Sequence, residues 1–289
     1  MSVSVTPAGV PVRAAKGLVL TIGCLLVILP FLAVVSTSLA DQQQVTRAGG
    51  YVLWPDNPSL EAYRALFSGG VVTRAVLVSV GITLVGTTLS LASTTLLAYG
   101  LSRPGSYGSK PILLLVLFSL LFAPGIIPMY LTVKQLGLLD SYWSLILPML
   151  INAFNVIVMR AFFLELPQEL LDSAKIDGAG EIAILTRIML PLSKAILAVI
   201  GLFYAVAYWN SFFSALLYIT ENEKYPLSLV LRTFVVNNAT IGTGDSGTAL
   251  PQQSLQMAML VVSILPILFV YPFLQKHFAK GIMIGAVKG

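Results

Sequence analysis

The sequence predicts an all-α integral membrane protein with six transmembrane helices. Of its 289 residues, 57% are hydrophobic and only 10% are charged, a balance typical of chains embedded in a bilayer. A helix that crosses a membrane needs about 20 consecutive, mainly apolar residues. Six segments meet this condition, and we expect spans at about residues 17–40, 75–102, 111–133, 141–163, 195–220 and 255–275.

The basic residues predict how these spans are oriented. Lysine and arginine concentrate in the cytoplasmic segments of membrane proteins. With the N-terminus inside, the short inner segments carry Arg13, Lys16, Arg103, Lys110, Lys175, Arg187, Lys194, Lys276, Lys280 and Lys288. We therefore expect both termini in the cytoplasm, with a leader at 1–16, outer loops at 41–73 and 221–254, and a tail at 276–289. The net charge of +5 is scattered over helix ends, so it indicates no nucleic-acid partner.

Local signals refine the elements in chain order. In the first outer loop, residues 59–66 predict a short helix capped by Ser59. In the second span, Gly81 and Gly86 stand among many serines and threonines, a composition typical of close helix–helix packing. In the third, Pro124-Gly125 predicts a break in the helix.

The fourth and fifth spans hold the polar side chains that are candidates for a substrate pathway. These are Asn152, Asn155, Tyr204, Tyr208, Trp209 and Asn210. Two interpretations are open. Amides and hydroxyls inside a membrane usually bond to neighbouring helices, but aromatic faces beside amides also suit a sugar.

Motifs for chemistry are absent from the sequence. It contains no phosphate-binding loop, nucleophile elbow or zinc-protease motif. With Cys24 as the only cysteine and His277 as the only histidine, we expect neither a catalytic site nor a metal site. No acidic residue lies in the core of a span, which argues against a proton- or sodium-driven carrier. Uphill transport would need an energy source outside this chain.

The most highly charged stretch is residues 165–191, between two apolar spans. Its pattern predicts two amphipathic helices joined at a corner around Gly178, with Pro167 in the first turn of one and Asp177 capping the other. Such an element is either an interfacial connector or a helix that docks in a groove of a soluble partner.

The same stretch carries a recognisable motif. It reads Asp172-Ser173-Ala174-x-x-Asp177-Gly178-Ala179, then eight residues, then Ile188-x-Leu190-Pro191. This pattern resembles the EAA loop of binding-protein-dependent ABC importer permeases. The resemblance implies a coupling helix that docks on a cytoplasmic ATPase, with Asp172, Ala174, Asp177, Gly178, Ala179, Ile188, Leu190 and Pro191 as its coupling residues.

Further segments, at residues 55–63, 136–148 and 271–289, are similar to the carbohydrate branch of this family, of the maltose and multiple-sugar second-permease type. The resemblance implies a type I importer permease fold in the bacterial inner membrane and transport of an oligosaccharide. It also implies a homologous second permease, an ABC ATPase dimer, an extracytoplasmic sugar-binding protein and lipid as partners. This chain would bind no cofactor, because ATP and magnesium belong to the ATPase.

The motif departs from the family pattern at two places. Asp172-Ser173 replaces the usual Glu-Ala, and Leu185 replaces an aromatic residue. The shorter acid puts an ion pair to the ATPase in question, whereas Leu185 still suits an apolar groove. The alternatives are an ABC permease for a solute other than sugar and a secondary transporter.

Overall fold

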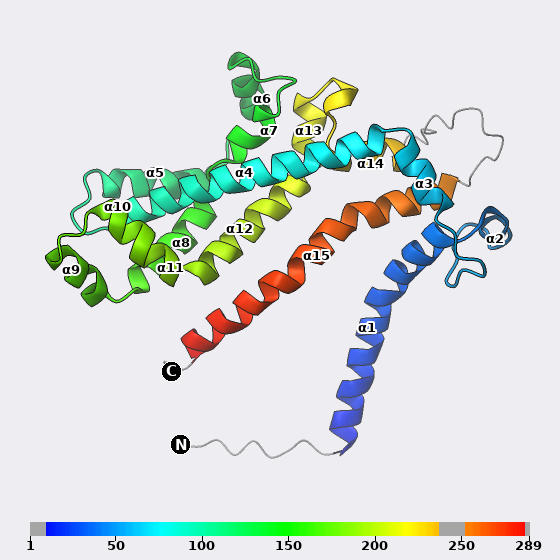
Figure 1. Ribbon diagram of the computed structural model, residues 1–289, viewed down its shortest axis with the longest axis horizontal. Coiled ribbons are helices and arrows are strands. Elements are labelled where there is room, and N and C mark those ends of the chain that lie inside the picture. The colour runs from blue at the N-terminus through cyan, green and yellow to red at the C-terminus, as the bar shows by residue number, and fades with distance from the viewer. Residues whose placement is uncertain (1–9, 237–251, 287–289) are drawn as a thin grey trace. The chain divides into compact units, whose positions relative to one another are not determined.

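The computed structural model describes residues 10–236 and 252–286, and every regular element in these ranges is a helix (Figure 1). Parts of the predicted leader, second outer loop and tail (residues 1–9, 237–251 and 287–289) lie outside the described residues. The chain forms two compact units, one of Met1–Gly69 with Thr233–Ile264 and one of Gly70–Arg232 with Leu265–Gly289.

The first unit contains three complete helices, α1 (Val10–Leu39), α2 (Gln42–Arg47) and α3 (Glu61–Ser68). Hydroxyl groups near the end of α1 hold the loop that follows it. The main-chain N–H of Val52 donates to Thr37 Oγ1 over 2.9 Å, and Ser38 bonds to the Tyr63 hydroxyl over 2.7 Å. The predicted short helix is present as α3, but its N-terminal cap is Leu60 rather than Ser59, whose Oγ accepts a bond from the N–H of Glu61.

The second unit contains most of the remaining elements. They are α4 (Val71–Ser102), α5 (Ser109–Leu121), α6 (Ile126–Gln135), α7 (Trp143–Ile146), η1 (Leu147–Met149), α8 (Ala153–Glu165), α9 (Gln168–Ile176), α10 (Glu181–Ile184), η2 (Leu185–Met189), α11 (Leu190–Leu192), α12 (Lys194–Trp209), α13 (Phe212–Tyr218) and η3 (Asn222–Lys224). Two more helices, α14 (Leu227–Val236) and α15 (Gln252–Ala286), contribute to both units.

Helix α4 is the centre of the second unit, and α8 and α12 pack along it (Figure 1). Tyr208 of α12 approaches the backbone of α4 closely at Gly86, where a Cβ atom would lie 2.7 Å from the tyrosine ring. Tyr208 is only 1% exposed and shares its core with Met159 and Ile200. The close packing predicted for span two is therefore present at Gly86, whereas Gly81 has open space beside it.

Three described helices are long and apolar enough to cross a membrane, namely Pro11–Leu39, Val71–Ser102 and Gln252–Val270. Two bent pairs raise the number to as many as five. Trp143–Met149 joins Ala153–Glu165 at 48°, and Glu181–Leu192 joins Lys194–Trp209 at 84°.

The expected third, fourth and fifth spans are divided, the fourth at the 48° bend between Trp143–Met149 and Ala153–Glu165. The third is α5 and α6, separated at Pro124-Gly125 as predicted, and Gly125 has a positive φ of 80°. The fifth, expected as one helix over 195–220, ends at Trp209 and resumes at Phe212. There the N–H of Phe212 turns back to the carbonyl of Asn210 over 2.7 Å, so Asn210 lies in a turn between two helices.

Asp140 ties the turn after α6 to the segment after α13. Its carboxylate accepts bonds from the N–H groups of Thr220 and Glu221, at 2.6 and 3.0 Å, and from the Thr220 hydroxyl. Its φ of 57° is the one positive value among the described residues other than glycine, and aspartate tolerates this conformation better than most residues. The bonds from the Thr220 hydroxyl and from the two N–H groups hold the pKa of the Asp140 carboxyl below its ordinary value.

We expect Asp140→Asn to lower the thermal stability of the purified protein at neutral pH, and to have less effect in acid. Because folding lowers this pKa, the charge stabilises the fold above the unfolded carboxyl pKa of about 3.9. That stabilisation is lost as the pH falls through the lower folded value. Asparagine also tolerates positive φ, so the backbone is preserved. Thermal unfolding from about pH 7 to about pH 3 measures the difference in midpoint between the wild type and the variant. A difference that stays constant over this range would contradict the role of the Asp140 charge.

Candidate functional site

Residues 165–191 form two short helices, α9 and α10, joined at a corner, as the sequence predicts. The N–H of Gly178 donates to the carbonyl of Lys175 over 3.0 Å, and that of Ala179 to the carbonyl of Ala174 over 2.9 Å. This pair of bonds is a Schellman motif, which requires a left-handed residue after the helix. Gly178 supplies it with a φ of 80°, which glycine adopts at no steric cost.

The expected role of Asp177 as the cap of the second helix is wrong. Asp177 is the C-terminal cap of α9, and Gly180 precedes the first residue of α10. The left-handed turn at Gly178 follows Asp177 directly, so Asp177 belongs to the end of the first helix. Pro167 lies one residue before α9 rather than in its first turn.

The predicted coupling residues divide into two sets by exposure. Asp172, Asp177, Gly178 and Pro191 are exposed, whereas Ala174, Ala179, Ile188 and Leu190 are half-buried against this chain's own core. Two large apolar residues outside the motif, Ile176 and Ile182, flank the corner and are 86% and 81% exposed. Exposed apolar side chains gathered at one place are typical of an interaction surface.

The expectation that Leu185 faces a partner's groove is wrong. Leu185 is 7% exposed and belongs to the core of this chain, together with Ile184 and Met189. Residues 185–189 form a π-helical turn, which shifts the side chains after it relative to a regular α-helix. The apolar side chain offered to solvent at the start of this helix is that of Ile182.

A group of charged residues joins the corner to the end of α4. Glu181 Oε2 lies 3.3 Å from Arg103 Nε, and Glu181 Oε1 lies 3.5 Å from Lys175 Nζ. The Tyr99 hydroxyl donates to Glu181 Oε2 and accepts a bond of 2.8 Å from Arg103 Nη2. The bond from Tyr99, with the charges of Arg103 and Lys175, holds the pKa of the Glu181 carboxyl below its ordinary value.

Two tyrosines of α12 bond across the helices of the second unit. The Tyr208 hydroxyl bonds to Ser90 Oγ over 2.7 Å and donates to the carbonyl of Ile146 at 3.1 Å. The Tyr204 hydroxyl bonds to Thr94 Oγ1 over 2.7 Å and accepts the N–H of Asn152 at 2.9 Å. Both hydroxyls therefore make the interhelical bonds that a membrane environment favours.

Three of the predicted pathway residues come together at a hollow of about 370 Å³. Asn152, Asn155 and Tyr204 line it, with Pro148, Met149, Ile151, Phe154, Phe203 and Ala207. Asn152 also caps α8, because its Oδ1 accepts the N–H of Asn155 at 3.2 Å. Amides beside phenylalanine and tyrosine rings can bind the hydroxyl groups and the apolar faces of a sugar.

The other predicted pathway residues lie outside this hollow. Tyr208 and Trp209 are buried at 1% and 7% exposure, and Asn210 donates its Nδ2 to the carbonyl of Val206 over 2.9 Å. Arg160 was not among the candidates. Its Nε donates to the carbonyl of Leu101 over 2.9 Å and so ties α8 to the end of α4. The sequence feature that could have pointed to Arg160 is a lone arginine near the end of an apolar segment.

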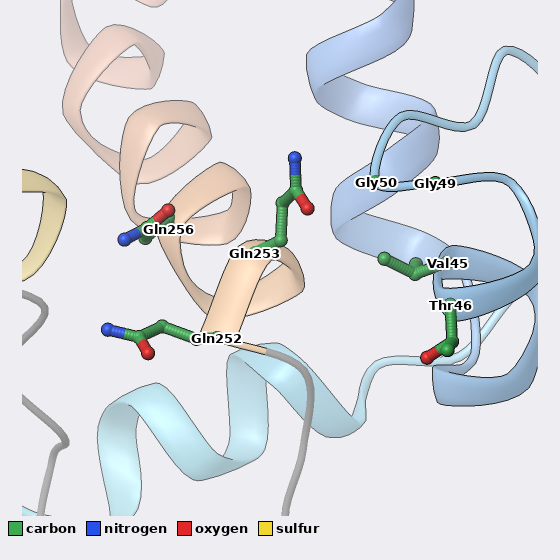
Figure 2. A pocket seen from close by; sticks show the side chains of 7 residues that line it. All are labelled: Val45, Thr46, Gly49, Gly50, Gln252, Gln253 and Gln256. Atoms are coloured by element: carbon green, nitrogen blue, oxygen red, sulfur yellow. The ribbon is translucent and has the colours of Figure 1, made fainter.

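A second hollow, in the first unit, has polar walls. It measures about 540 Å³ and is lined by Val45, Thr46, Gly49, Gly50, Gln252, Gln253 and Gln256. Figure 2 shows that Gln253 points toward the loop at Gly50, whereas Gln252 and Gln256 point away from it. The polar groups do not converge, and we assign no ligand to this hollow. Among the described residues, no cluster of three or more His, Cys, Asp or Glu side chains could hold a metal ion.

The family is decided by a match over most of the chain. Residues 13–284 match the family described as "Binding-protein-dependent transport system inner membrane component". The chain belongs to this family. It is therefore a membrane permease component of an ABC transport system in the inner membrane. The exposed corner at Gly178 is part of this permease.

Two relatives and one chain of a solved structure are similar to this permease over most of its length. The polygalacturonan/rhamnogalacturonan transport system permease protein YtcP of Bacillus subtilis is 46% identical over 270 residues, which are 92% of this chain and 94% of the relative. Protein LplC of the same organism is 48% identical over 265 residues, 91% of this chain and 90% of the relative. A chain of a solved bacterial ABC transporter involved in the import of the acidic polysaccharide alginate matches with a TM-score of 0.87 and 28% identity. That match covers 94% of this chain and all of the other.

Proposed function

We propose that this permease carries an oligosaccharide into the cell as part of an ABC importer. The observation that carries the proposal is the 46% identity, over 92% of this chain, to a relative named for polygalacturonan/rhamnogalacturonan transport. The likeness to a chain of an alginate importer supports it. So does the hollow at Asn152, Asn155 and Tyr204, whose amides and hydroxyl suit a sugar.

The proposed topology has six spans with both termini in the cytoplasm. The three long helices and the two bent pairs supply up to five spans. The sixth is α5 with α6, a helix broken at Pro124-Gly125. Broken helices are tolerated in membranes where they face protein or a cavity, and a homologous second permease would provide such a surface.

The proposed coupling element is the corner at Gly178. An ATPase dimer, which binds the ATP and magnesium, would receive the exposed side of the corner, with Ile176 at the end of α9 and Ile182 in α10. Closure of that dimer would then displace the corner and switch the pathway between inward- and outward-facing states. An extracytoplasmic binding protein would deliver the sugar on the other side.

The test is reconstitution of this permease in liposomes with its partner permease, its ATPase and its binding protein. We expect vanadate-sensitive ATP hydrolysis to rise when the binding protein carries galacturonate oligosaccharides, and the rise to be absent with amino acids or peptides. If a solute without sugar rings stimulates ATP hydrolysis instead, the proposal that this permease carries a carbohydrate is wrong. Transport without any ATPase would overturn the importer assignment itself.

We expect Asn152→Ser to weaken transport about fivefold without unfolding the protein. Serine caps a helix as well as asparagine does, so the start of α8 is preserved. The variant removes the carboxamide, and one neutral hydrogen bond to a substrate is worth about 1 kcal/mol. Solute uptake and thermal unfolding are measured together, with Asn152→Ala as the variant that also lacks the cap. If the serine variant transports normally and only the alanine variant fails, Asn152 is a structural cap.

A further inference from the structure

We infer that Tyr99 and Arg103 clamp Glu181 so that a displacement of the coupling corner passes directly to helix α4. This inference rests on the proposed coupling role of the corner. Tyr99 and Arg103 lie at the C-terminal end of α4, and Glu181 is the first residue of α10. They are positioning residues, because they act on the pathway through α4.

The contact is buried on the side of α4 and open to solvent at Glu181, whose side chain is 54% exposed. The side chain of Arg103 is 10% exposed, Tyr99 is 8% exposed, and the guanidinium carbon of Arg103 lies 4.5 Å from the centre of the Tyr99 ring. The Tyr99 hydroxyl lies within hydrogen-bond distance of two acceptors of Glu181, its carboxylate and its main-chain carbonyl, the latter at 3.1 Å. Bonds to charged groups are stronger than neutral bonds, so we expect the corner to follow α4 at this point.

The covalent route from the corner to α12 is less direct. It passes through the π-helical turn Leu185–Met189 and through Pro191, and the helices on either side of residue 193 meet at 84°. Pro191 has no N–H to donate to the preceding turn. A segment with an interrupted hydrogen-bond ladder can bend and absorb part of a displacement, whereas the clamp on Glu181 has no such joint.

Helix α4 connects the clamp to residues that line the hollow of the proposed pathway. Thr94 lies five residues before Tyr99 on the same helix and bonds to the Tyr204 hydroxyl over 2.7 Å. That hydroxyl also holds the N–H of Asn152, which lines the hollow. A shift of α4 is therefore transmitted to Tyr204 and Asn152 through these two hydrogen bonds.

The experiment compares Tyr99→Phe with Tyr107→Phe in the reconstituted importer. Phenylalanine keeps the ring beside Arg103 and removes only the hydroxyl that holds Glu181. Tyr107, in the connection between α4 and α5, is fully exposed at 102%, and its variant is the matched control. We expect Tyr99→Phe to lower transport about tenfold, within the usual range of coupling between two sites, while the ATPase still co-purifies. We expect Tyr107→Phe to transport like the wild type.

A pair of charge-exchange variants distinguishes loss of the clamp from misfolding of the protein. Arg103→Glu alone should abolish transport, and Arg103→Glu combined with Glu181→Arg should restore part of it, because the attraction between α4 and the corner is rebuilt. Equal transport by Tyr99→Phe and Tyr107→Phe would overturn the inference. Loss of ATPase co-purification in Tyr99→Phe would also overturn it, since the clamp would then only shape the docking surface. Failure of the proposed function would look different, as the wild type itself would bind no ATPase.

Discussion

Replacing Gly178 with asparagine should weaken ATPase binding and transport strongly while leaving the fold of the permease intact. Asparagine tolerates positive φ better than most residues, so the corner keeps its shape. A Cβ at Gly178 meets no atom of this chain within 4 Å, so nothing inside the chain opposes a side chain there. A partner packed on the corner would be overpacked, which typically costs about 1–3 kcal/mol, equivalent to about 5- to 150-fold in affinity. Co-purification of the ATPase and stimulated ATP hydrolysis measure this loss.

Two companion variants separate the bend from the contact. Gly178→Ala should lower stability as well as transport, because a left-handed alanine costs about 1–2 kcal/mol. Gly180→Ala is the control for stability, since Gly180 has a φ of −72° and open space around it. If Gly178→Asn binds the ATPase and couples like the wild type, the corner is only a connector between spans.

Replacing Gly86 with alanine should destabilise the second unit strongly. The new Cβ would lie 2.7 Å from the ring of Tyr208, and that ring is held by bonds from its hydroxyl to Ser90 and to the carbonyl of Ile146. Helices α4 and α12 would have to separate, and overpacking of this kind costs about 1–3 kcal/mol. Thermal unfolding in detergent should show a clearly lower midpoint.

The control for this prediction lies on the same helix. Gly81→Ala adds the same methyl group where nothing lies within 4 Å, and we expect it to leave the midpoint unchanged or slightly raised. Adding Tyr208→Leu to Gly86→Ala should cost less than the sum of the two single changes, because the smaller side chain makes room. Additive losses would mean that the two residues do not meet.

Features that depend on neighbours along the chain follow from the amino-acid sequence alone. Long apolar segments determined the membrane class, since a bilayer requires about 20 apolar residues in a row. Gly178 determined the corner, because the left-handed turn and both of its hydrogen bonds involve residues within five positions of each other. Pro124-Gly125 determined the break between α5 and α6 in the same local way.

Which face of each helix is covered follows from the packing of distant segments and could not be predicted from the sequence. The sequence predicts that Leu185 suits an apolar groove, whereas the π-helical turn and the packing around it bury Leu185 and leave Ile182 exposed. The clamp joins residues 82 positions apart, and the bond from Ser90 to Tyr208 joins residues 118 apart. A helical pattern marks an apolar or polar face but does not say which helix packs on it, and that choice depends on distant segments whose positions the local sequence does not set.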